Sequence, residues 1–141
     1  MERQSIFKHQ TACGEGFMCT ILVIDDEKGI LRVIEEALTK FGHQVELAAD
    51  GYEGIRKFDD GSYDIVITDL RMPGIDGKGV VRHIRNSHKN SIPIIGISGT
   101  PWLIQDSGFD VVLPKPFPLL DLVESVKKIA TNPSKSAISA G

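Results

Sequence analysis

Short apolar segments of this sequence are each followed by polar residues that could do chemistry together. Asp25 and Asp26 follow ILVI, Asp69 follows IVIT, Ser98 follows IIGI, and Lys115 follows VVLP. Carboxylates can hold a divalent cation, and an ionised aspartate can attack phosphorus when a metal ion and a lysine neutralise the transferring oxygens. Whether these five side chains act together depends on the elements that carry them.

Runs rich in β-branched residues alternate along the chain with segments whose apolar residues have helical spacing. The runs predict five strands, at Thr20–Ile24, Gln44–Ala48, Ile65–Thr68, Ile92–Ile97 and Asp110–Leu113. The helical spacing predicts helices at Lys28–Lys40, Gly51–Asp59, Lys78–Ser87 and Leu119–Ala130. Alternating strands and helices, with continuously apolar strands, are typical of a parallel sheet covered on both faces. We therefore expect a doubly wound α/β fold with a five-stranded parallel sheet.

The polar residues lie where such a sheet binds its ligands, at the carboxyl ends of the strands. Three carboxylates brought together there repel one another unless a cation or a proton intervenes. The candidate ligands are hard oxygens, which favour Mg²⁺, with Mn²⁺ as the alternative, over Zn²⁺. Mg²⁺ leaves coordination positions for phosphate, so a phosphoryl group is the expected substrate. Asp25 and Asp26 are adjacent and suit metal binding, whereas Asp69 stands alone and is the candidate nucleophile.

Each residue also has an ordinary structural interpretation. Asp25 and Asp26 could cap the following helix, Asp69 could open a turn, and Lys115 could be a solvated surface charge. Taken singly, each of these interpretations is reasonable. Their joint occurrence at successive strand ends favours a shared cation site.

The composition indicates one ordinary domain. The chain has 141 residues, 41% of them hydrophobic, and a formal net charge of -3, which gives no electrostatic footprint for nucleic acid or anionic lipid. No apolar run is long enough for a membrane span, and Cys13 and Cys19 form no CxxC motif, so we expect a cytoplasmic protein. Residues 1–18 and 131–141 show no clear periodicity and are expected to be flexible, on either side of a domain at 19–130.

Four motifs of the sequence together resemble those of bacterial response-regulator receiver domains. These are ILVIDDE, DIVITDLRMPGIDG, PIIGISG and LPKPF, and the resemblance runs from about Cys19 to about Ala130. It implies a flavodoxin-like strand order of 2-1-3-4-5. It also implies that Asp69 is the phosphoacceptor, that Asp26 binds Mg²⁺ directly and Asp25 mostly through water, and that the Arg71 backbone carbonyl completes the metal site.

The same resemblance assigns the remaining site residues and the partners. Ser98 matches the hydroxyl that turns toward the phosphoryl group, and Lys115 matches the lysine that pairs with it, before a peptide to Pro116 that is usually cis. Arg71 and Thr100 match positions that tune the phosphoaspartate lifetime. The donor would be a sensor histidine kinase or histidine phosphotransfer protein, and output would pass to an unknown downstream protein. Such a module has only its own autophosphorylation and autodephosphorylation activity and is not otherwise an enzyme.

The sequence departs from the family pattern in two places. The stretch from Ser98 to Lys115 is about one helical turn shorter than usual, so we expect a stunted fourth helix at Trp102–Ser107, with Trp102 covering the sheet or, as the alternative, anchoring a partner. Val112 stands where most relatives carry the Tyr or Phe whose ring moves on phosphorylation. We therefore expect the output surface to differ from that of most relatives, both in its shape and in the side chain that responds to phosphorylation.

Two other functions compete with the phosphorylated receiver. A scaffold that is never phosphorylated would fit the stunted helix and Val112. A phosphatase acting on a metabolite would fit a nucleophilic Asp69, although no cap insertion is evident in the sequence. Other charged and imidazole side chains are expected at the surface. The histidines expected there are His43, His83 and His88. We interpret the basic run of Arg82, Arg85, His88 and Lys89 as a solvated face, with docking of a partner as the alternative.

Overall fold

The computed structural model describes residues 18–101 and 108–131. The proposed fourth helix, including Trp102, lies outside the described residues, as do nearly all of the predicted N-terminal extension and C-terminal tail. Within the described ranges, no helix is both long enough and apolar enough to cross a membrane.

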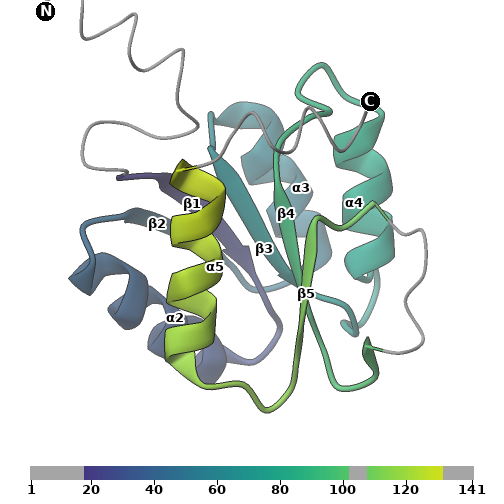
Figure 1. Ribbon diagram of the computed structural model, residues 1–141. Helices are drawn as coiled ribbons and strands as arrows, with labels where there is room; N and C mark the ends of the chain where they lie inside the picture. Colours follow the sequence, from purple (N-terminus) through teal and green to yellow (C-terminus); the bar gives the residue numbers. More distant parts are fainter. Residues whose placement is uncertain (1–17, 102–107, 132–141) are drawn as a thin grey trace, which may run out of the picture.

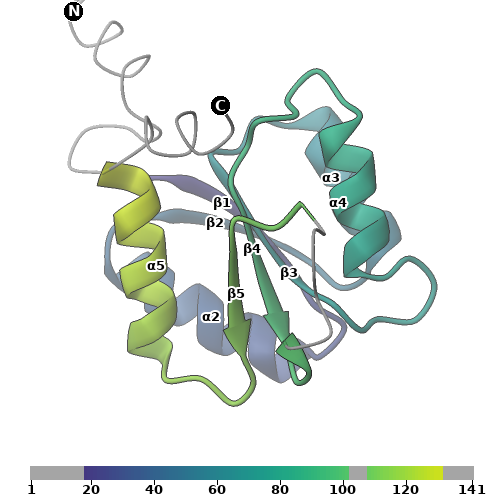
Figure 2. The ribbon, with the colours of Figure 1, turned by 45° about the vertical axis from the view of Figure 1, so that its right-hand side comes forward.

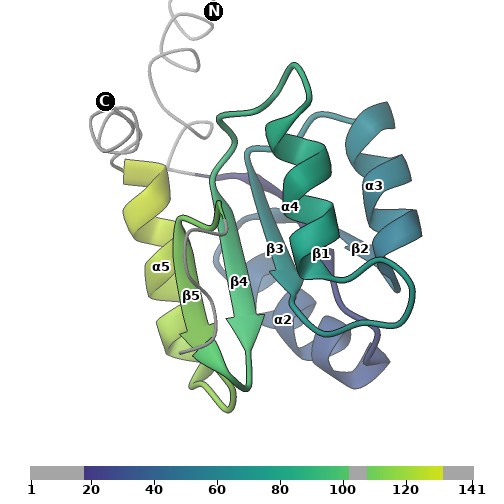
Figure 3. The ribbon, with the colours of Figure 1, turned by 90° about the vertical axis from the view of Figure 1, so that its right-hand side faces the viewer.

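Five parallel strands form one sheet in the order β2-β1-β3-β4-β5, which confirms the predicted fold (Figures 1 and 3). The strands are β1 (Thr20–Ile24), β2 (Gln44–Ala48), β3 (Ile65–Asp69), β4 (Ile94–Ser98) and β5 (Val111–Pro114). The helices are α2 (Lys28–Lys40), α3 (Gly51–Asp60), α4 (Gly77–Arg85) and α5 (Leu119–Thr131). Thr131, predicted to begin the flexible tail, is the last residue of α5.

The helices cover the sheet on both faces (Figure 2). On one face, α2 and α5 pack against alternate strand residues, with Ile34 and Val126 fully buried. On the other, α3 and α4 pack against the remaining strand residues, with Phe58 and Ile84 fully buried. Because both faces are covered, the inner strands are largely apolar, and most of their polar residues, Thr68, Asp69 and Ser98, lie at or next to the carboxyl ends.

Strand β4 begins two residues later than predicted. Pro93 has no N–H, and its carbonyl accepts a hydrogen bond from Val66. Ile92 donates instead to Lys89 in the preceding loop, and Ile94 donates to the carboxylate of Asp110. The regular ladder therefore starts at Ile94.

The loops leading into α3 and α4 are fixed by aspartate caps. Asp50 accepts a hydrogen bond from the Glu53 N–H at 2.8 Å, and Asp76 accepts one from the Gly79 N–H at 3.0 Å. A side-chain oxygen at this position satisfies an N–H that lacks a helical partner. Asp76 thereby sets the start of α4 close behind the end of β3.

His43 was predicted at the surface, and this prediction is wrong. The residue is 9% exposed, and its Nδ1 accepts a hydrogen bond from the backbone N–H of Cys19 at 3.0 Å. Burial lowers the pKa of the imidazole, so the neutral ring fits this acceptor role. His43 thus holds the start of β1 beside the start of β2.

The basic run is also not simply a solvated face. Arg85 donates to the carbonyls of Asn90, Ile92 and Gly108 and pairs with the Asp110 carboxylate at 3.0 Å. This arginine ties the end of α4 to the segment that enters β5. Lys89 donates to the carbonyl of Gly61 and lies over the ring of Phe58, whereas Arg82 and His88 are exposed.

Phe109 covers the part of the sheet beside which the stunted helix was predicted. A Cβ built on Gly96 of β4 would lie 2.7 Å from two ring atoms of Phe109 and 3.1 Å from Leu70 Cδ1. The ring therefore lies close to the β4 backbone, on the face that α3 and α4 cover. Val112, which was predicted to be a divergent switch position, pairs with Gly96 in the ladder and is half-buried.

Candidate metal and phosphoryl site

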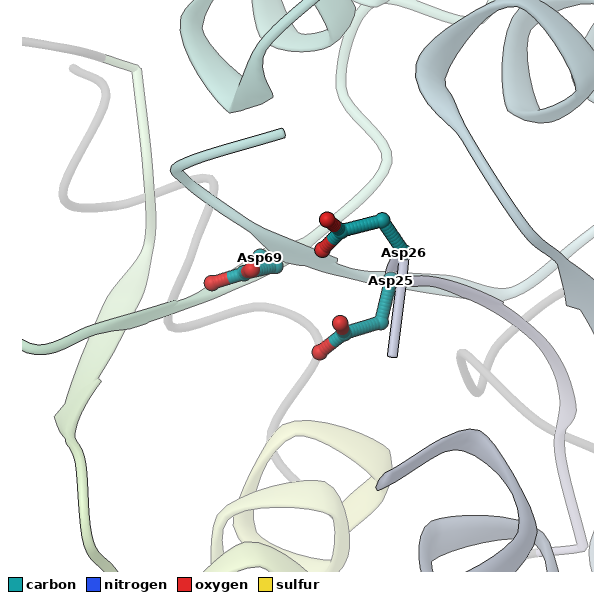
Figure 4. A group of neighbouring side chains, drawn as sticks. All are labelled: Asp25, Asp26 and Asp69. Carbon is teal, nitrogen blue, oxygen red and sulfur yellow. The ribbon is translucent and has the colours of Figure 1, made fainter. Parts of the chain in front are cut away.

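Three aspartates meet at the carboxyl ends of β1 and β3, which are neighbours in the sheet (Figure 4). Asp25 and Asp26 directly follow β1, and Asp69 is the last residue of β3. Each offers one carboxylate oxygen to a group whose members all lie within 4.8 Å of one another. Asp25 and Asp69 are buried, at 1% and 5% exposed, whereas Asp26 is exposed. The arrangement gives a cation one solvent-facing and two buried carboxylates.

Asp25 is held in place on one side only. Its Oδ1 accepts a hydrogen bond from the Glu27 N–H at 2.9 Å, and its backbone N–H donates to Ala48 of β2. Its Oδ2 is buried and has no hydrogen-bond partner among the described residues. Burial raises the pKa of this carboxyl to about 6, a shift that the hydrogen bond from Glu27 only partly offsets. A buried carboxylate oxygen without a donor fits a site for a hard cation.

Lys115 supplies positive charge to the site. Its Nζ lies 3.3 Å from Asp69 Oδ1, 3.4 Å from Glu27 Oε1 and 3.9 Å from Asp25 Oδ2. Burial disfavours the charged ammonium, but the surrounding carboxylates outweigh burial and raise the pKa of Lys115. The pKa of Asp69 is nevertheless raised, because burial outweighs the nearby lysine. One ammonium therefore leaves the carboxylates short of positive charge, and a divalent cation would supply it.

The backbone after β5 aims Lys115 at the site. The Lys115–Pro116 peptide is cis, which confirms the prediction made from the family pattern. The Lys115 N–H donates to the carbonyl of Ser98 at 2.8 Å, so the last residue of β4 fixes the start of this turn.

Ser98 is buried at 2% exposed, and its Oγ accepts a hydrogen bond from the Thr100 N–H at 2.9 Å. Thr100 Oγ1 lies 3.4 Å from the same oxygen. The serine hydroxyl is thus connected to the position two residues after it, where the family pattern places a tuning residue.

The loop after Asp69 carries Arg71, whose side chain is exposed. The loop starts with Leu70, which donates to Ile97 and accepts from Gly77. It borders an open hollow of about 420 Å³ lined by Leu70, Arg71, Met72, Pro73 and Asp76. Arg71 therefore follows Asp69 by two residues and is accessible to a partner that approaches this loop.

The structure thus brings together the predicted acidic residues and Lys115, with Ser98 at the neighbouring strand end. It also corrects the alternative interpretation of Asp25 and Asp26 as caps of the following helix. The N-cap of α2 is Glu27 rather than Asp25 or Asp26, and the Glu27 side chain makes no capping hydrogen bond. Its contact with Lys115 was not predicted. The only sign of this contact in the sequence was that Glu27, a third carboxylate, directly follows Asp25 and Asp26.

Comparisons with known proteins agree with this geometry. The protein-family model for the response regulator receiver domain matches residues 21–127 of this chain. The transcriptional regulatory protein TcrA of Mycobacterium tuberculosis is 32% identical over 124 residues, which are 84% of this chain and 49% of that protein. An uncharacterized transcriptional regulatory protein of Bacillus subtilis, YcbL, is 33% identical over 75% of this chain and 48% of its own length. The chain spans about half the length of these curated relatives.

Solved structures show the same similarity. The response regulator TrrA of Thermotoga maritima, in complex with Mg²⁺-BeF, is 37% identical with a TM-score of 0.73, covering 79% of this chain and 99% of that one. The chemotaxis response regulator CheY4 of Vibrio cholerae is 28% identical with a TM-score of 0.75, covering 79% of this chain and 98% of that one.

Proposed function

Because the chain belongs to the family of response regulator receiver domains of two-component systems, we propose that it accepts a phosphoryl group on Asp69 with the help of Mg²⁺. The observation that carries the proposal is the group of three carboxylates with Lys115 beside them. One of their oxygens, the buried Oδ2 of Asp25, accepts no hydrogen bond among the described residues. In this proposal the receiver domain spans residues 19–130, with α5 extending to Thr131.

The proposed Mg²⁺ ligands are Asp25, Asp26, Asp69 and the backbone carbonyl of Arg71. The carboxylates present fit the oxygen preference of Mg²⁺, and Mn²⁺, which shares this preference, is the alternative ion. When bound, the ion neutralises negative charge on the transferring phosphoryl oxygens. Asp26, the exposed member of the three carboxylates, would hold the ion from the solvent side.

In the proposed transfer, an Asp69 carboxylate oxygen attacks the phosphorus of a phosphohistidine. The O–P bond forms as the P–N bond breaks, and the histidine nitrogen leaves with the electron pair of that bond. Lys115, already 3.3 Å from Asp69, pairs with a phosphoryl oxygen as charge develops. Ser98 donates its hydroxyl hydrogen to a second oxygen. Later, water attacks the phosphorus of the phosphoaspartate, the O–P bond to Asp69 breaks, and inorganic phosphate leaves, which returns Asp69 to its carboxylate.

The proposed donor is a sensor histidine kinase or a histidine phosphotransfer protein in the cytoplasm. The output passes to a downstream protein that the structure does not identify. The open loop around Arg71 suits a protein donor, because among the described residues no cap encloses the acceptor. Arg71 and Thr100 are the proposed tuning positions for the phosphoaspartate lifetime. The exposure of Arg71 two residues after Asp69, and the hydrogen bond from the Thr100 N–H to Ser98, support this assignment.

Intact-mass spectrometry after incubation with acetyl phosphate tests the proposal, with and without Mg²⁺. Wild type should gain one phosphoryl adduct that needs Mg²⁺, and Asp69→Ala should gain none. Asp121→Ala, which removes an exposed carboxylate in the first turn of α5, is the matched control and should be labelled like wild type. An unlabelled wild type, under conditions that label another receiver, would overturn the proposal in favour of a scaffold. Release of phosphate from many turnovers of a phosphorylated metabolite would favour a phosphatase.

A further inference from the structure

We infer that Glu27 is a positioning residue for phosphoryl transfer, acting through Lys115. Its carboxylate holds the ammonium at the solvent edge of the site and competes with the phosphoryl group for it. The inference rests on the proposed function, since it concerns how readily Lys115 reaches a group on Asp69.

The contacts of the ammonium carry this inference. Lys115 Nζ donates to Glu27 Oε1 at 3.4 Å and lies 3.3 Å from Asp69 Oδ1, so two carboxylates share it almost equally. The two partners differ in exposure, because the Glu27 side chain is 62% exposed and the Asp69 side chain 6%. One partner therefore holds the ammonium toward solvent and the other toward the acceptor.

The backbone of Glu27 explains why its side chain is available for this contact. The residue is the N-cap of α2, yet its side chain makes no capping hydrogen bond. Its N–H donates to Asp25 Oδ1, and its carbonyl accepts from Leu31. The main chain is thus fixed beside the proposed metal ligands, while the carboxylate reaches a lysine on the far side of the sheet's carboxyl edge.

Because Glu27 competes for the Lys115 ammonium, the ammonium is less available to pair with the transferring phosphoryl oxygens. Glu27→Gln keeps the size of the side chain and removes its charge. The rate constant for labelling by acetyl phosphate should then rise about two- to fivefold, the size expected for one partly exposed ion pair. Glu36→Gln removes the charge of an exposed glutamate on the same helix and should leave the rate as in wild type.

A double-mutant cycle with Lys115→Met separates this contact from general repulsion of an anionic donor. If Glu27 acts through Lys115, Glu27→Gln should change the slow labelling of Lys115→Met by much less than it changes wild type. An equal fold-change in both backgrounds would overturn the inference. Phosphoramidate, which carries less negative charge than acetyl phosphate, gives a second comparison that needs no lysine variant. If Glu27 acts through Lys115, Glu27→Gln should change the labelling rate by the same factor for both donors. A clearly larger factor for acetyl phosphate would contradict the inference.

The outcomes also separate this inference from the proposed function. If wild type takes no label, the proposed function fails. If wild type is labelled with Mg²⁺ and Glu27→Gln is labelled at the same rate, only the role of Glu27 is wrong.

Discussion

The carbonyl oxygen of Asp69 lies where a side chain at Gly77 would have to be, 2.5 Å from a Cβ built on that glycine. The Leu70 Cα lies 2.8 Å from the same point. Both neighbours are backbone atoms at the end of β3, so they cannot move aside as a flexible side chain could. The first residue of α4 therefore has to be glycine for the acceptor strand to end as it does.

We predict that Gly77→Ala lowers the free energy of unfolding by about 1–3 kcal/mol, the usual range for overpacking a tight site. It should also slow labelling by acetyl phosphate, because the displaced backbone belongs to Asp69. Gly29→Ala is the matched control, since nothing lies within 4 Å of its built Cβ and alanine favours helix by up to about 1 kcal/mol. Urea unfolding and intact mass measure the two effects. A Gly77→Ala variant as stable and as reactive as wild type would show that the loop tolerates a side chain.

The raised pKa of Asp25 predicts how stability depends on pH without metal. The folded pKa is about 6 against 3.8 in the unfolded chain, so the native state binds this proton more tightly. The resulting stabilisation is complete below about pH 4 and is lost as pH rises through about 6. Relative to Asp25→Asn, wild type should lose roughly 1–2 kcal/mol between pH 5 and pH 7.5, at about 1.4 kcal/mol per pKa unit. Denaturant unfolding in EDTA at several pH values measures it, and parallel curves for the two proteins would refute it.

Mg²⁺ should act in the opposite direction, because it needs the ionised carboxylates. We expect Mg²⁺ to raise the melting temperature of wild type at pH 7.5 and to raise it less at pH 5, where protons compete for Asp25. Asp25→Asn should respond weakly at both values. Thermal unfolding with and without the ion measures the shifts. Equal shifts in Asp25→Asn and wild type would place the ion elsewhere.

Arg85 should contribute to stability through its hydrogen bonds to three backbone carbonyls and Asp110. We predict that Arg85→Ala lowers the free energy of unfolding by about 2 kcal/mol, because carbonyls in the loop before β4 and in the segment before β5 lose a charged donor. Arg82→Ala, on the exposed side of the same helix, should stay within about 0.5 kcal/mol of wild type. Urea unfolding compares them. Equal losses in the two variants would mean that the Arg85 network adds nothing.

Much of the fold was predictable because its signals are local. Continuously apolar strands and helical spacing led to the correct element order, and polar residues after the strands marked the edge that carries the site. The errors at His43 and Arg85 came from tertiary contacts. Nothing local to His43 shows that it accepts a hydrogen bond from Cys19. Nothing local to Arg85 shows that it also pairs with Gly108 and Asp110, in the segment before β5. The start of β4 could have been placed correctly from Pro93, whose missing N–H prevents regular pairing.

The packing of Phe109 on Gly96 leads to the last prediction, which concerns β4 and the residue that covers it. A Cβ at Gly96 would lie 2.7 Å from the ring, so Gly96→Ala should lower the free energy of unfolding by about 1–3 kcal/mol. Phe109→Leu should itself destabilise, because it removes ring contacts. Since the smaller side chain leaves room for the added methyl group, the double variant should lose less than the two single losses added together.

Denaturant unfolding of the four proteins measures this coupling, which contacting residues show at about 0.5–3 kcal/mol. Additive losses would mean that the ring does not rest on Gly96. A positive coupling would show that an aromatic residue three positions before Val112 covers β4 beside that residue. Labelling of Phe109→Leu by acetyl phosphate would then test whether this ring, through Leu70 beside Asp69, also affects the acceptor.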